Sequence, residues 1–358
     1  SVVVDIADAS LNSGDKVSAV TFTFSDAPAG FDLTDITAVG GTLSGLTVSP
    51  TDPKVFTATF TATDGFTGTG SVSVANASYT DTAGNAGSGA SDAVPIDTVA
   101  PSVVVDILDT RLTSGDKLSF VTFTFSDPPV GFTLADITAV GGTLSGLTIS
   151  PFDPRVYSAT FTATDGFTGT GSVAVTAGTY TDAAGNSGGG GSDTVAIDTV
   201  VPSVVVDILD TGLNSGDNVS TVSFTFSDAP VGFTGADITA FGGTLTGLTP
   251  TADPKVFTAT FTAFPGFTGT GSVSVATASY TNSSGNLGTG NSDTVAIGTV
   301  GPSVAVDILD SRLSGADKVS FVTFTFSDAP VGFDLTDITA VGGTLSGLTI
   351  SPFDPRVY

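Results

Sequence analysis

The residues of this chain that could perform chemistry are aspartates, which recur at fixed positions. All 35 acidic residues are Asp, against 9 Lys and Arg, and the chain has neither His nor Cys. Carboxylates, amide oxygens and main-chain carbonyls are hard ligands that suit calcium, which takes about six to eight oxygens. Binding of a hard divalent cation is therefore the chemistry open to this chain, and Ca²⁺ is the expected cofactor.

The same composition argues against catalysis. Without His there is no ordinary proton shuttle at neutral pH, and without Cys there is no thiolate nucleophile or thiolate metal site. Paired carboxylates could hydrolyse glycosides, but they would need one cleft with sugar-binding aromatics, whereas these aspartates recur on turns in every copy. The aromatics are 26 Phe against 5 Tyr, which is typical of core filling. We predict that the chain is not an enzyme.

Charge and hydropathy limit the partners. The net charge of −26 opposes binding to nucleic acid and to anionic membrane surfaces. No apolar run approaches the length needed to span a bilayer. We therefore expect no nucleic-acid partner and no membrane insertion.

A sequence repeat of about a hundred residues occurs three times, and the beginning of a fourth copy follows. Ser1, Ser102, Ser203 and Ser303 mark the register, so successive copies lie 101, 101 and 100 residues apart. This period is too long for a solenoid unit and suits an independently folding domain. The predicted domains are residues 1–100, 101–201 and 202–301, followed by residues 302–358 as the first half of a fourth.

Within each copy, short segments alternate apolar and small polar residues between Gly, Pro, Asp and Asn, and no segment has helical periodicity. Val20, Phe22 and Phe24 should face the core from one segment, and Phe56, Ala58 and Phe60 from another. Seven short strands in this length indicate an all-β fold of tandem immunoglobulin-like Greek-key β-sandwich domains, arranged end to end as an elongated rod. The strands predicted in the first copy are Val2–Ile6, Val17–Ser25, Asp35–Val39, Leu43–Val48, Val55–Thr63, Ser71–Tyr79 and Ala93–Asp97.

Five phrases of the first copy together resemble the bacterial immunoglobulin-like repeats of very large surface adhesins and biofilm-associated proteins. They cover residues 20–26, 30–36, 41–46, 78–85 and 96–101, and the resemblance extends over the whole chain. It implies an extracellular region that extends the protein from the cell surface, commonly rigidified by calcium at the domain junctions. The family often has Glu where these copies have Asp26, Asp127, Asp228 and Asp328.

The candidate calcium ligands lie on loops. In a seven-stranded sandwich the loops gather at two poles, and in an end-to-end array the far pole of one domain faces the near pole of the next. Carboxylates that converge there would repel one another without a cation. The candidates at the first junction are Asp8, Asp15, Asp64 and Asp97 facing Asp127, Asp153, Asp182 and Asn186, and those at the second are Asp109, Asp116, Asp165 and Asp198 facing Asp228, Asp253 and Asn286.

The third copy departs from this pattern. Pro265 replaces the equivalent of Asp64, and Gly298 replaces the equivalent of Asp97, both at the pole that would face the fourth copy. The paired loss is expected if the two positions share a cation, so the third junction should bind calcium weakly or not at all. Turn chemistry alone also accounts for any single Asp, because Asp caps its own backbone in turns. The Lys and Arg beside these aspartates are expected to form surface ion pairs.

Two functions remain open. The first is the rigid, calcium-stabilised stalk of a bacterial surface adhesin, located outside the cell, in which neighbouring repeats are one another's partners. The second is a self-assembling extracellular filament, sheath or matrix fibre in which copies of the chain contact each other. The fourth copy stops at Tyr358, where a strand should begin, and is expected to be an excerpt of a longer array or to receive strands from a neighbouring molecule.

Overall fold

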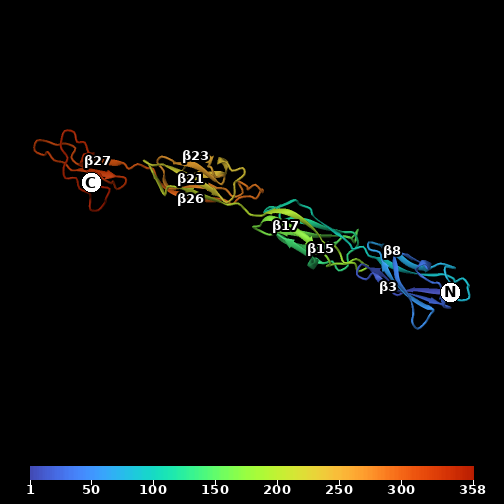
Figure 1. Ribbon diagram of the computed structural model, residues 1–358. Coiled ribbons are helices and arrows are strands. Elements are labelled where there is room, and N and C mark those ends of the chain that lie inside the picture. The colour runs from blue at the N-terminus through green and yellow to red at the C-terminus, as the bar shows by residue number, and fades with distance from the viewer. The chain divides into compact units, whose positions relative to one another are not determined.

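The structure is a computed structural model that describes residues 1–358. The chain divides into two compact units, Ser1–Val201 and Pro202–Tyr358, and each is described by itself. The first unit holds repeats 1 and 2, and the second holds repeat 3 and the partial repeat 4 (Figure 1). No helix in the structure has both the length and the apolar character of a membrane span.

Repeat 1 is a sandwich of two four-stranded sheets. One sheet has the order β1-β3-β7-β6 and the other β2-β10-β8-β5, and a short β4-β9 pair lies beside them. The predicted all-β sandwich is therefore confirmed. The elements are β1 (Val2–Ile6), β2 (Leu11–Asn12), β3 (Val17–Phe24), β4 (Pro28–Ala29), η1 (Leu33–Asp35), β5 (Ile36–Val39), β6 (Gly41–Val48), β7 (Val55–Ala62), β8 (Thr67–Val74), β9 (Thr80–Asp81) and β10 (Ala90–Asp97).

Repeats 2 and 3 have the same topology. Their sheets are β11-β13-β16-β15 with β12-β18-β17-β14, and β19-β21-β24-β23 with β20-β26-β25-β22. Repeat 2 contains β11 (Val103–Ile107), β12 (Arg111–Thr113), β13 (Leu118–Phe125), η2 (Leu134–Asp136), β14 (Ile137–Val140), β15 (Gly142–Ile149), β16 (Val156–Ala163), β17 (Thr168–Val175) and β18 (Gly191–Asp198). Repeat 3 contains β19 (Val204–Ile208), β20 (Gly212–Asn214), β21 (Val219–Phe226), η3 (Gly235–Asp237), β22 (Ile238–Phe241), β23 (Gly243–Pro250), β24 (Val256–Ala263), β25 (Thr268–Val275) and β26 (Asn291–Gly298).

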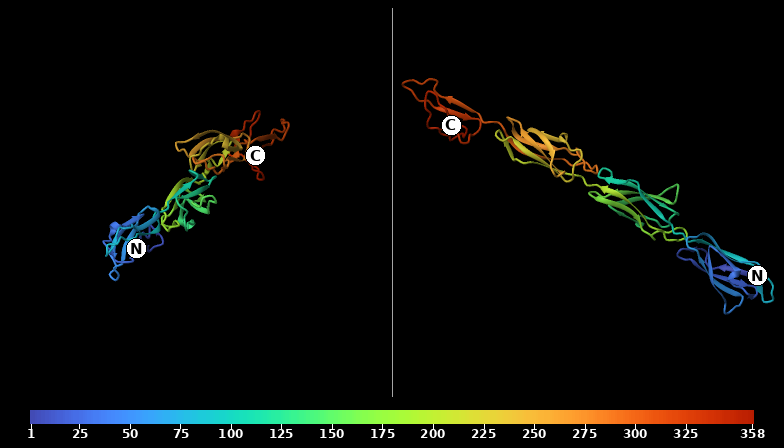
Figure 2. Two further views of the ribbon diagram at one scale, coloured as in Figure 1. Left: turned by 90° about the vertical axis from the view of Figure 1, so that its right-hand side faces the viewer. Right: turned by 45° about the horizontal axis from the view of Figure 1, so that its top comes forward.

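Repeat 4 has a single strand pair, β27 (Val304–Ile308) with β28 (Val322–Phe326), and the short helix η4 (Leu335–Asp337). Figure 2 shows this difference between the last repeat, in red, and the two-layered sandwiches before it. Phe324 is its only buried apolar side chain. Within residues 302–358 this strand pair has no second sheet packed against it.

Strict alternation builds each core. In β3 the side chains of Val20, Phe22 and Phe24 are buried, and in β7 those of Ala58 and Phe60, as predicted. Phe56 is partly buried and packs against the same cluster. Successive side chains of a strand point to opposite faces, so the intervening Thr and Ala residues face outward. Each of repeats 1, 2 and 3 has its own cluster of this kind.

One predicted strand is displaced. The strand predicted at Ser71–Tyr79 is found as β8, Thr67–Val74, because the Thr-Gly-Thr-Gly segment pairs with β10 instead of forming a loop. A Cβ on Gly70 would lie 2.3 Å from Ile96 Cδ1, so this glycine allows the strand to cross the core. The turn between the predicted strands Val55–Thr63 and Ser71–Tyr79 is thus shorter than expected and centres on Gly65, whose φ is +69°.

At the start of repeats 1, 2 and 3 the chain crosses from one sheet to the other, which the sequence did not reveal. β1 pairs antiparallel with β3, and the chain then crosses to the other sheet, where β2 pairs parallel with β10. At the crossing, Asp92 Oδ2 accepts a hydrogen bond from the main-chain NH of Ile6 at 2.8 Å. Asp193 and Asp293 make the same bond in repeats 2 and 3, so this aspartate is structural.

Candidate functional site

The loops between β1 and β3 and after β10 form the far pole of repeat 1. Beyond β2 the chain turns tightly, because Asn12 Oδ1 accepts hydrogen bonds from the NH groups of Gly14 and Asp15 at 2.9 and 2.8 Å. An Asn that accepts bonds from the residues after it is a common way to stabilise a turn. The turn leaves the Ser13 NH and the Asn12 side-chain amide free to bind outside repeat 1.

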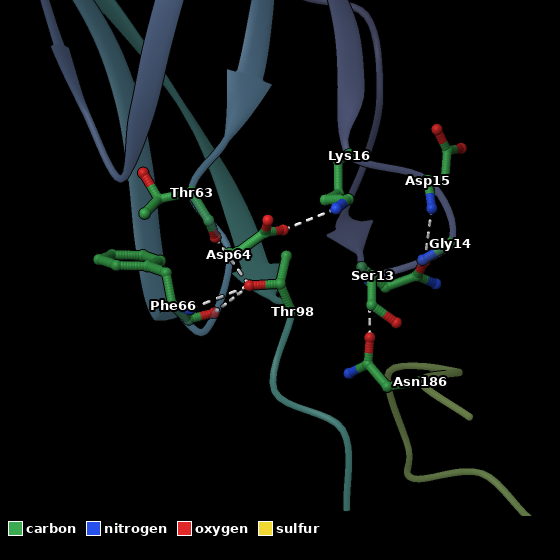
Figure 3. A network of polar contacts seen from close by, with 10 residues as sticks. Ser13, Gly14, Asp15, Lys16, Thr63, Asp64, Phe66, Thr98 and Asn186 are labelled. Carbon is green, nitrogen blue, oxygen red and sulfur yellow. Dashed lines mark hydrogen bonds and ion pairs between the residues drawn. The ribbon is translucent and has the colours of Figure 1, made fainter. Parts of the chain in front are cut away.

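The end of β10 is held by Thr98, a buried residue that follows the strand. Thr98 Oγ1 donates to the Thr63 carbonyl at 2.8 Å and accepts from the Phe66 NH at 2.9 Å. This hydroxyl fixes the turn between β7 and β8 against the exit of β10. Figure 3 shows Thr98 bonded to Thr63 and Phe66.

The near pole of repeat 2 contributes the loop between β17 and β18. Asp182 closes this loop, because its carboxylate accepts from both the NH and the side-chain amide of Asn186, at 2.9 and 2.8 Å. Gly185 sits between them with φ of +89°, a conformation that favours glycine. The loop therefore holds the Asn186 side chain in a single orientation.

Asn186 joins the two repeats. Its Oδ1 accepts from the Ser13 NH at 2.7 Å, and its Nδ2 donates to the Asp97 carbonyl at 2.9 Å. A third bond runs from Asn12 Nδ2 to the Ala184 carbonyl at 2.7 Å. Figure 3 shows Asn186 entering beside Ser13 from the second repeat. We name this set of contacts the Asn186 junction.

A comparison with repeat 1 shows that the junction buries the asparagine. Asn186 is 0% exposed and Asp182 is 5% exposed. Asn85 and Asp81 form the same turn in repeat 1, with Asn85 Nδ2 donating to Asp81 Oδ2 at 2.7 Å, yet Asn85 is exposed. Bonds from Asn85 hold the pKa of Asp81 below its ordinary value. The turn thus forms without a neighbour, and the contact with repeat 1 removes Asn186 from water.

The linker is also held by repeat 2. The Pro101 carbonyl accepts from the Gly189 NH at 2.8 Å and from the Tyr180 hydroxyl at 3.4 Å. Tyr180 is almost fully buried, and burial raises the pKa of its hydroxyl. The linker is therefore held to repeat 1 at Thr98 and to repeat 2 at Pro101, which Tyr180 binds. Few residues between these two points are unrestrained.

The structure brings together only some of the predicted calcium ligands of the first junction. Asp97, Asp182 and Asn186 meet there, but Asp97 contributes its main-chain carbonyl, and its carboxylate accepts from Thr67 Oγ1 at 2.8 Å. The Asp15 carboxylate points away from Asn186 (Figure 3). Asp8 lies farther back, where its NH donates to Ser18 Oγ.

Other predicted ligands are engaged in ion pairs, as expected for the basic residues. Lys16 Nζ lies 2.6 Å from Asp64 Oδ1, and Lys117 lies 2.6 Å from Asp165. In repeat 3 both members of this pair are replaced, by Asn218 and Pro265. The ion pair thus explains the loss of Asp at position 265 without a cation. Gly298 ends β26, and this ion pair does not explain why it replaces an Asp.

At the turn between β15 and β16, Arg155 pairs with Asp153 at 2.9 Å. Hydrogen bonds from Arg155 lower the pKa of the Asp153 carboxyl. Asp127 is exposed and accepts from Ser126 Oγ at 3.0 Å. Asp153 and Asp127, at the near pole of repeat 2, therefore each bind a residue of their own repeat.

The remaining predicted ligands are those of the second junction, and they are described within each unit by itself. In repeat 2, Asp109 and Asp116 lie on the loop between β11 and β13, and Asp198 accepts from Thr168 Oγ1 at 3.0 Å. In repeat 3, Asp228 lies 3.9 Å from Lys255, Asp253 accepts from the Lys255 NH at 2.9 Å, and the Asn286 NH donates to Asn282 Oδ1 at 3.0 Å.

No group of three or more acidic side chains lies close enough together to hold a metal ion. The junction oxygens of Asn186 and Asp182 are instead occupied by hydrogen bonds within the protein. The residues of the first junction therefore fit a hydrogen-bonded contact between the two repeats.

Sandwich domains joined through their loops define the chain as a tandem immunoglobulin-like repeat protein. The chain belongs to the family of bacterial Ig-like domains, which it matches over residues 1–96, 97–197, 198–299 and 298–354. It is a tandem series of such domains.

Several solved structures are similar. Invasin, a bacterial integrin-binding protein, is 15% identical over 94% of this chain and 68% of that chain, with a TM-score of 0.35. The Yersinia pseudotuberculosis adhesin InvE is 17% identical over 55% and 58%, with a TM-score of 0.23. Domains 4–9 of the surface layer protein SbsC are 14% identical over 91% and 53%, with a TM-score of 0.22. These likenesses concern the fold alone. Among curated protein sequences no significant match was found.

Sequence reasoning missed Asn12, which contributes to the Asn186 junction, and Thr98 and Tyr180, which hold the linker on either side of it. A signal was present, because Thr98, Thr199 and Thr299 recur after the last strand, and Tyr79, Tyr180 and Tyr280 recur in the loop before it. All six are hydroxyl residues at positions where a polar side chain is buried and must find a partner.

Proposed function

We propose that this chain is an extracellular structural segment, the rigid stalk of a bacterial surface adhesin, in which the repeats keep a binding region at a distance from the cell. The observation that carries the proposal is the Asn186 junction. Its three hydrogen bonds fix repeat 2 against repeat 1, and Asn186 is excluded from water. Buried hydrogen bonds of this kind restrict orientation, because leaving a partner unpaired is costly.

The absence of cysteine allows a direct test. Ser44 and Ser145 are exposed and occupy equivalent positions in repeats 1 and 2, so S44C/S145C can carry two spin labels without further substitution. For a stalk, pulsed electron spin resonance on residues 1–201 should give one narrow distance distribution. A broad distribution spanning many separations would show that the repeats move independently, and the stalk would be wrong.

We also propose that calcium binds to this region and stiffens it. The net charge of −26 and the many exposed aspartates favour a divalent counter-ion. The spin-labelled protein tests this separately, because calcium should narrow the distance distribution and a chelator should widen it. If calcium and chelator give the same distribution, the junction is stiffened by hydrogen bonds alone.

The second candidate is a self-assembling extracellular filament or matrix fibre. Repeats 2 and 4 favour it, because each exposes an apolar aromatic side chain on a turn, Phe152 and Phe353. Light scattering of the purified chain over a range of concentrations tests it, since a stalk segment stays monomeric and a filament subunit does not.

A further inference from the structure

Each of repeats 1, 2 and 3 contains one parallel strand pair, which joins the beginning of the repeat to its end. β2 pairs with β10, β12 with β18 and β20 with β26. Every other strand pair of repeat 1 is antiparallel. β10 ends at the far pole beside the Asn186 junction, so β2 and β10 both run from the near pole toward the far pole.

Tension along the chain reaches this pair from opposite ends. The chain enters repeat 1 through β1, which pairs with β3 from Val2 to Ile6, and it leaves after Asp97. Tension therefore draws β1 and β2 toward the near pole and β10 toward the far pole. Two strands drawn apart along their own axes load all their hydrogen bonds together, whereas strands peeled from one end break them one after another. The parallel pair is thus arranged to resist tension.

Buried side chains fix the register of the pair. Leu11 lies opposite Ile96, and both side chains are 2% exposed. A slip of one residue would turn such a side chain away from the core, because a strand alternates its faces with a period of two. Sliding under load therefore has to expose apolar surface, which opposes it. The same buried pair recurs in repeats 2 and 3, as Leu112 with Ile197 and Leu213 with Ile297.

Two side chains anchor the strands of this pair. Asp92 belongs to β10, and its carboxylate accepts the hydrogen bond from the NH of Ile6, the last residue of β1. Thr98 follows β10, and its hydroxyl binds Thr63 and Phe66 in the neighbouring turn. Sliding of β1 and β2 past β10 breaks the first of these bonds, and withdrawal of β10 breaks the second. Both anchors therefore add to the resistance of the pair.

Repeat 1 lacks one hydrogen bond that repeats 2 and 3 make beside this pair. The Ala196 NH donates to the Thr110 carbonyl at 3.3 Å, and the Ala296 NH donates to the Thr211 carbonyl at 3.4 Å. Repeat 1 has Pro95 at this position, and proline has no NH to donate. Accordingly, β2 spans two residues, whereas β12 and β20 span three. The chain therefore contains two forms of the pair that differ by one bond.

We propose that the parallel pair β2–β10, with its equivalents β12–β18 and β20–β26, is a mechanical clamp that lets each repeat bear tension along the chain without unfolding. The clamp rests on the proposed stalk function, because the stalk supplies the tension. The two can fail separately, since spin-label distances test the stalk and unfolding under force tests the clamp. Repeat 1 lacks the bond that Pro95 removes, so it should unfold at a lower force than repeat 2.

Pulling the full chain through two pairs of attachment points in optical tweezers tests the clamp. The chain has no native cysteine, and Ser1, Asp15 and Ala100 are exposed. S1C/A100C pulls repeat 1 along its strands, whereas D15C/A100C pulls at the far pole only and peels β2 from β10. At one fixed force, unfolding should be about tenfold or more slower through S1C/A100C, because several bonds must break together. Equal unfolding rates in the two geometries would overturn the proposal.

Substitutions taken from the protein's own repeats then test the bond that distinguishes the two forms of the clamp. Pro95→Ala gives repeat 1 the residue of repeats 2 and 3, and it should slow unfolding through S1C/A100C about two- to tenfold at a fixed force, because one more hydrogen bond is loaded. Ala196→Pro, pulled through S102C/V201C, should speed unfolding of repeat 2 by a similar factor.

The matched control is Pro53→Ala, which makes the same change of residue in the exposed turn between β6 and β7. It alters the unfolded chain in the same way as Pro95→Ala but adds no bond to the clamp, so it should leave the unfolding rate unchanged. A Pro95→Ala variant that unfolds at the rate of this control would contradict the clamp, even if Ala196→Pro fails to fold. An equal slowing by Pro95→Ala through S1C/A100C and D15C/A100C would contradict it too, since the added bond would then stabilise the repeat in every direction.

Discussion

Asn186→Ala is the sharpest test of the junction, because the chain contains its own control. The substitution removes the acceptor of the Ser13 NH and the donor to the Asp97 carbonyl, both across the junction. It also removes the bond to Asp182 within the turn. Asn85→Ala removes only the corresponding turn bond to Asp81, since Asn85 is exposed. The difference between the two variants isolates the contact between the repeats.

The magnitude follows from the number of bonds and their burial. Two hydrogen bonds contribute about 0.5–1.5 kcal/mol each, and a Ser13 NH left unpaired in the contact adds about 1–3 kcal/mol. Asn186→Ala should therefore cost about 2–6 kcal/mol more than its control, and toward the lower end where water enters and recovers part of the loss. Asn85→Ala should cost about 0.5–1 kcal/mol, because its single bond is exposed to solvent.

Urea unfolding of residues 1–201, followed by two-dimensional NMR, resolves the repeats separately. In the wild type, docking should stabilise repeat 2, and Asn186→Ala should lower its unfolding midpoint and let the repeats unfold independently. Spin labels on S44C/S145C should at the same time report a broader distance distribution. Equal losses from Asn186→Ala and Asn85→Ala, with an unchanged distribution, would refute the reasoning that the contact stabilises the junction.

Further outcomes follow from other residues. Asp182→Asn should preserve the junction turn, because repeat 3 has Asn282 there and its Oδ1 accepts from the Asn286 NH, whereas Asp182→Ala should loosen it by about 1–3 kcal/mol in the same unfolding experiment. Thr98→Val should lower stability by about 1–3 kcal/mol, because the Phe66 NH loses its buried acceptor; Thr98→Ser is the control and should recover most of the loss in thermal unfolding. Gly70→Ala should destabilise repeat 1 by about 1–3 kcal/mol through overlap with Ile96, whereas Gly65→Ala meets no neighbouring atom and should show only the cost of its positive φ. Asp64→Asn should change stability by less than about 1 kcal/mol, and the change should vanish at high salt, because the pair with Lys16 is exposed.

The strands were predictable because their pattern is local. Val20, Phe22 and Phe24 alternate with polar or small residues, and a period of two places them on one face whatever the rest of the chain does. The displaced strand shows the limit of this reasoning. Thr67–Gly70 falls outside the predicted strand and belongs to β8, where close packing of Gly70 on Ile96 requires a residue without a side chain.

The candidate site was predictable only as a location. Loop positions placed Asp97, Asp182 and Asn186 at one junction, and the structure brings these three together. Their roles could not be read from residue type, because aspartate serves equally as a metal ligand, a turn cap and an ion-pair partner. Asp64 is an ion-pair partner of Lys16, and Asp92 binds the main chain of β1.

The repeat period, the two-layered sandwich and the scarcity of catalytic side chains all follow from the sequence, since each depends on composition or on neighbours a few residues apart. That Asn186 is the residue that joins two repeats emerges only from the folded chain. Ser13 and Asn186 lie 173 residues apart in the sequence and meet at 2.7 Å. Such contacts depend on where separate loops end in space, which no local pattern of residues specifies.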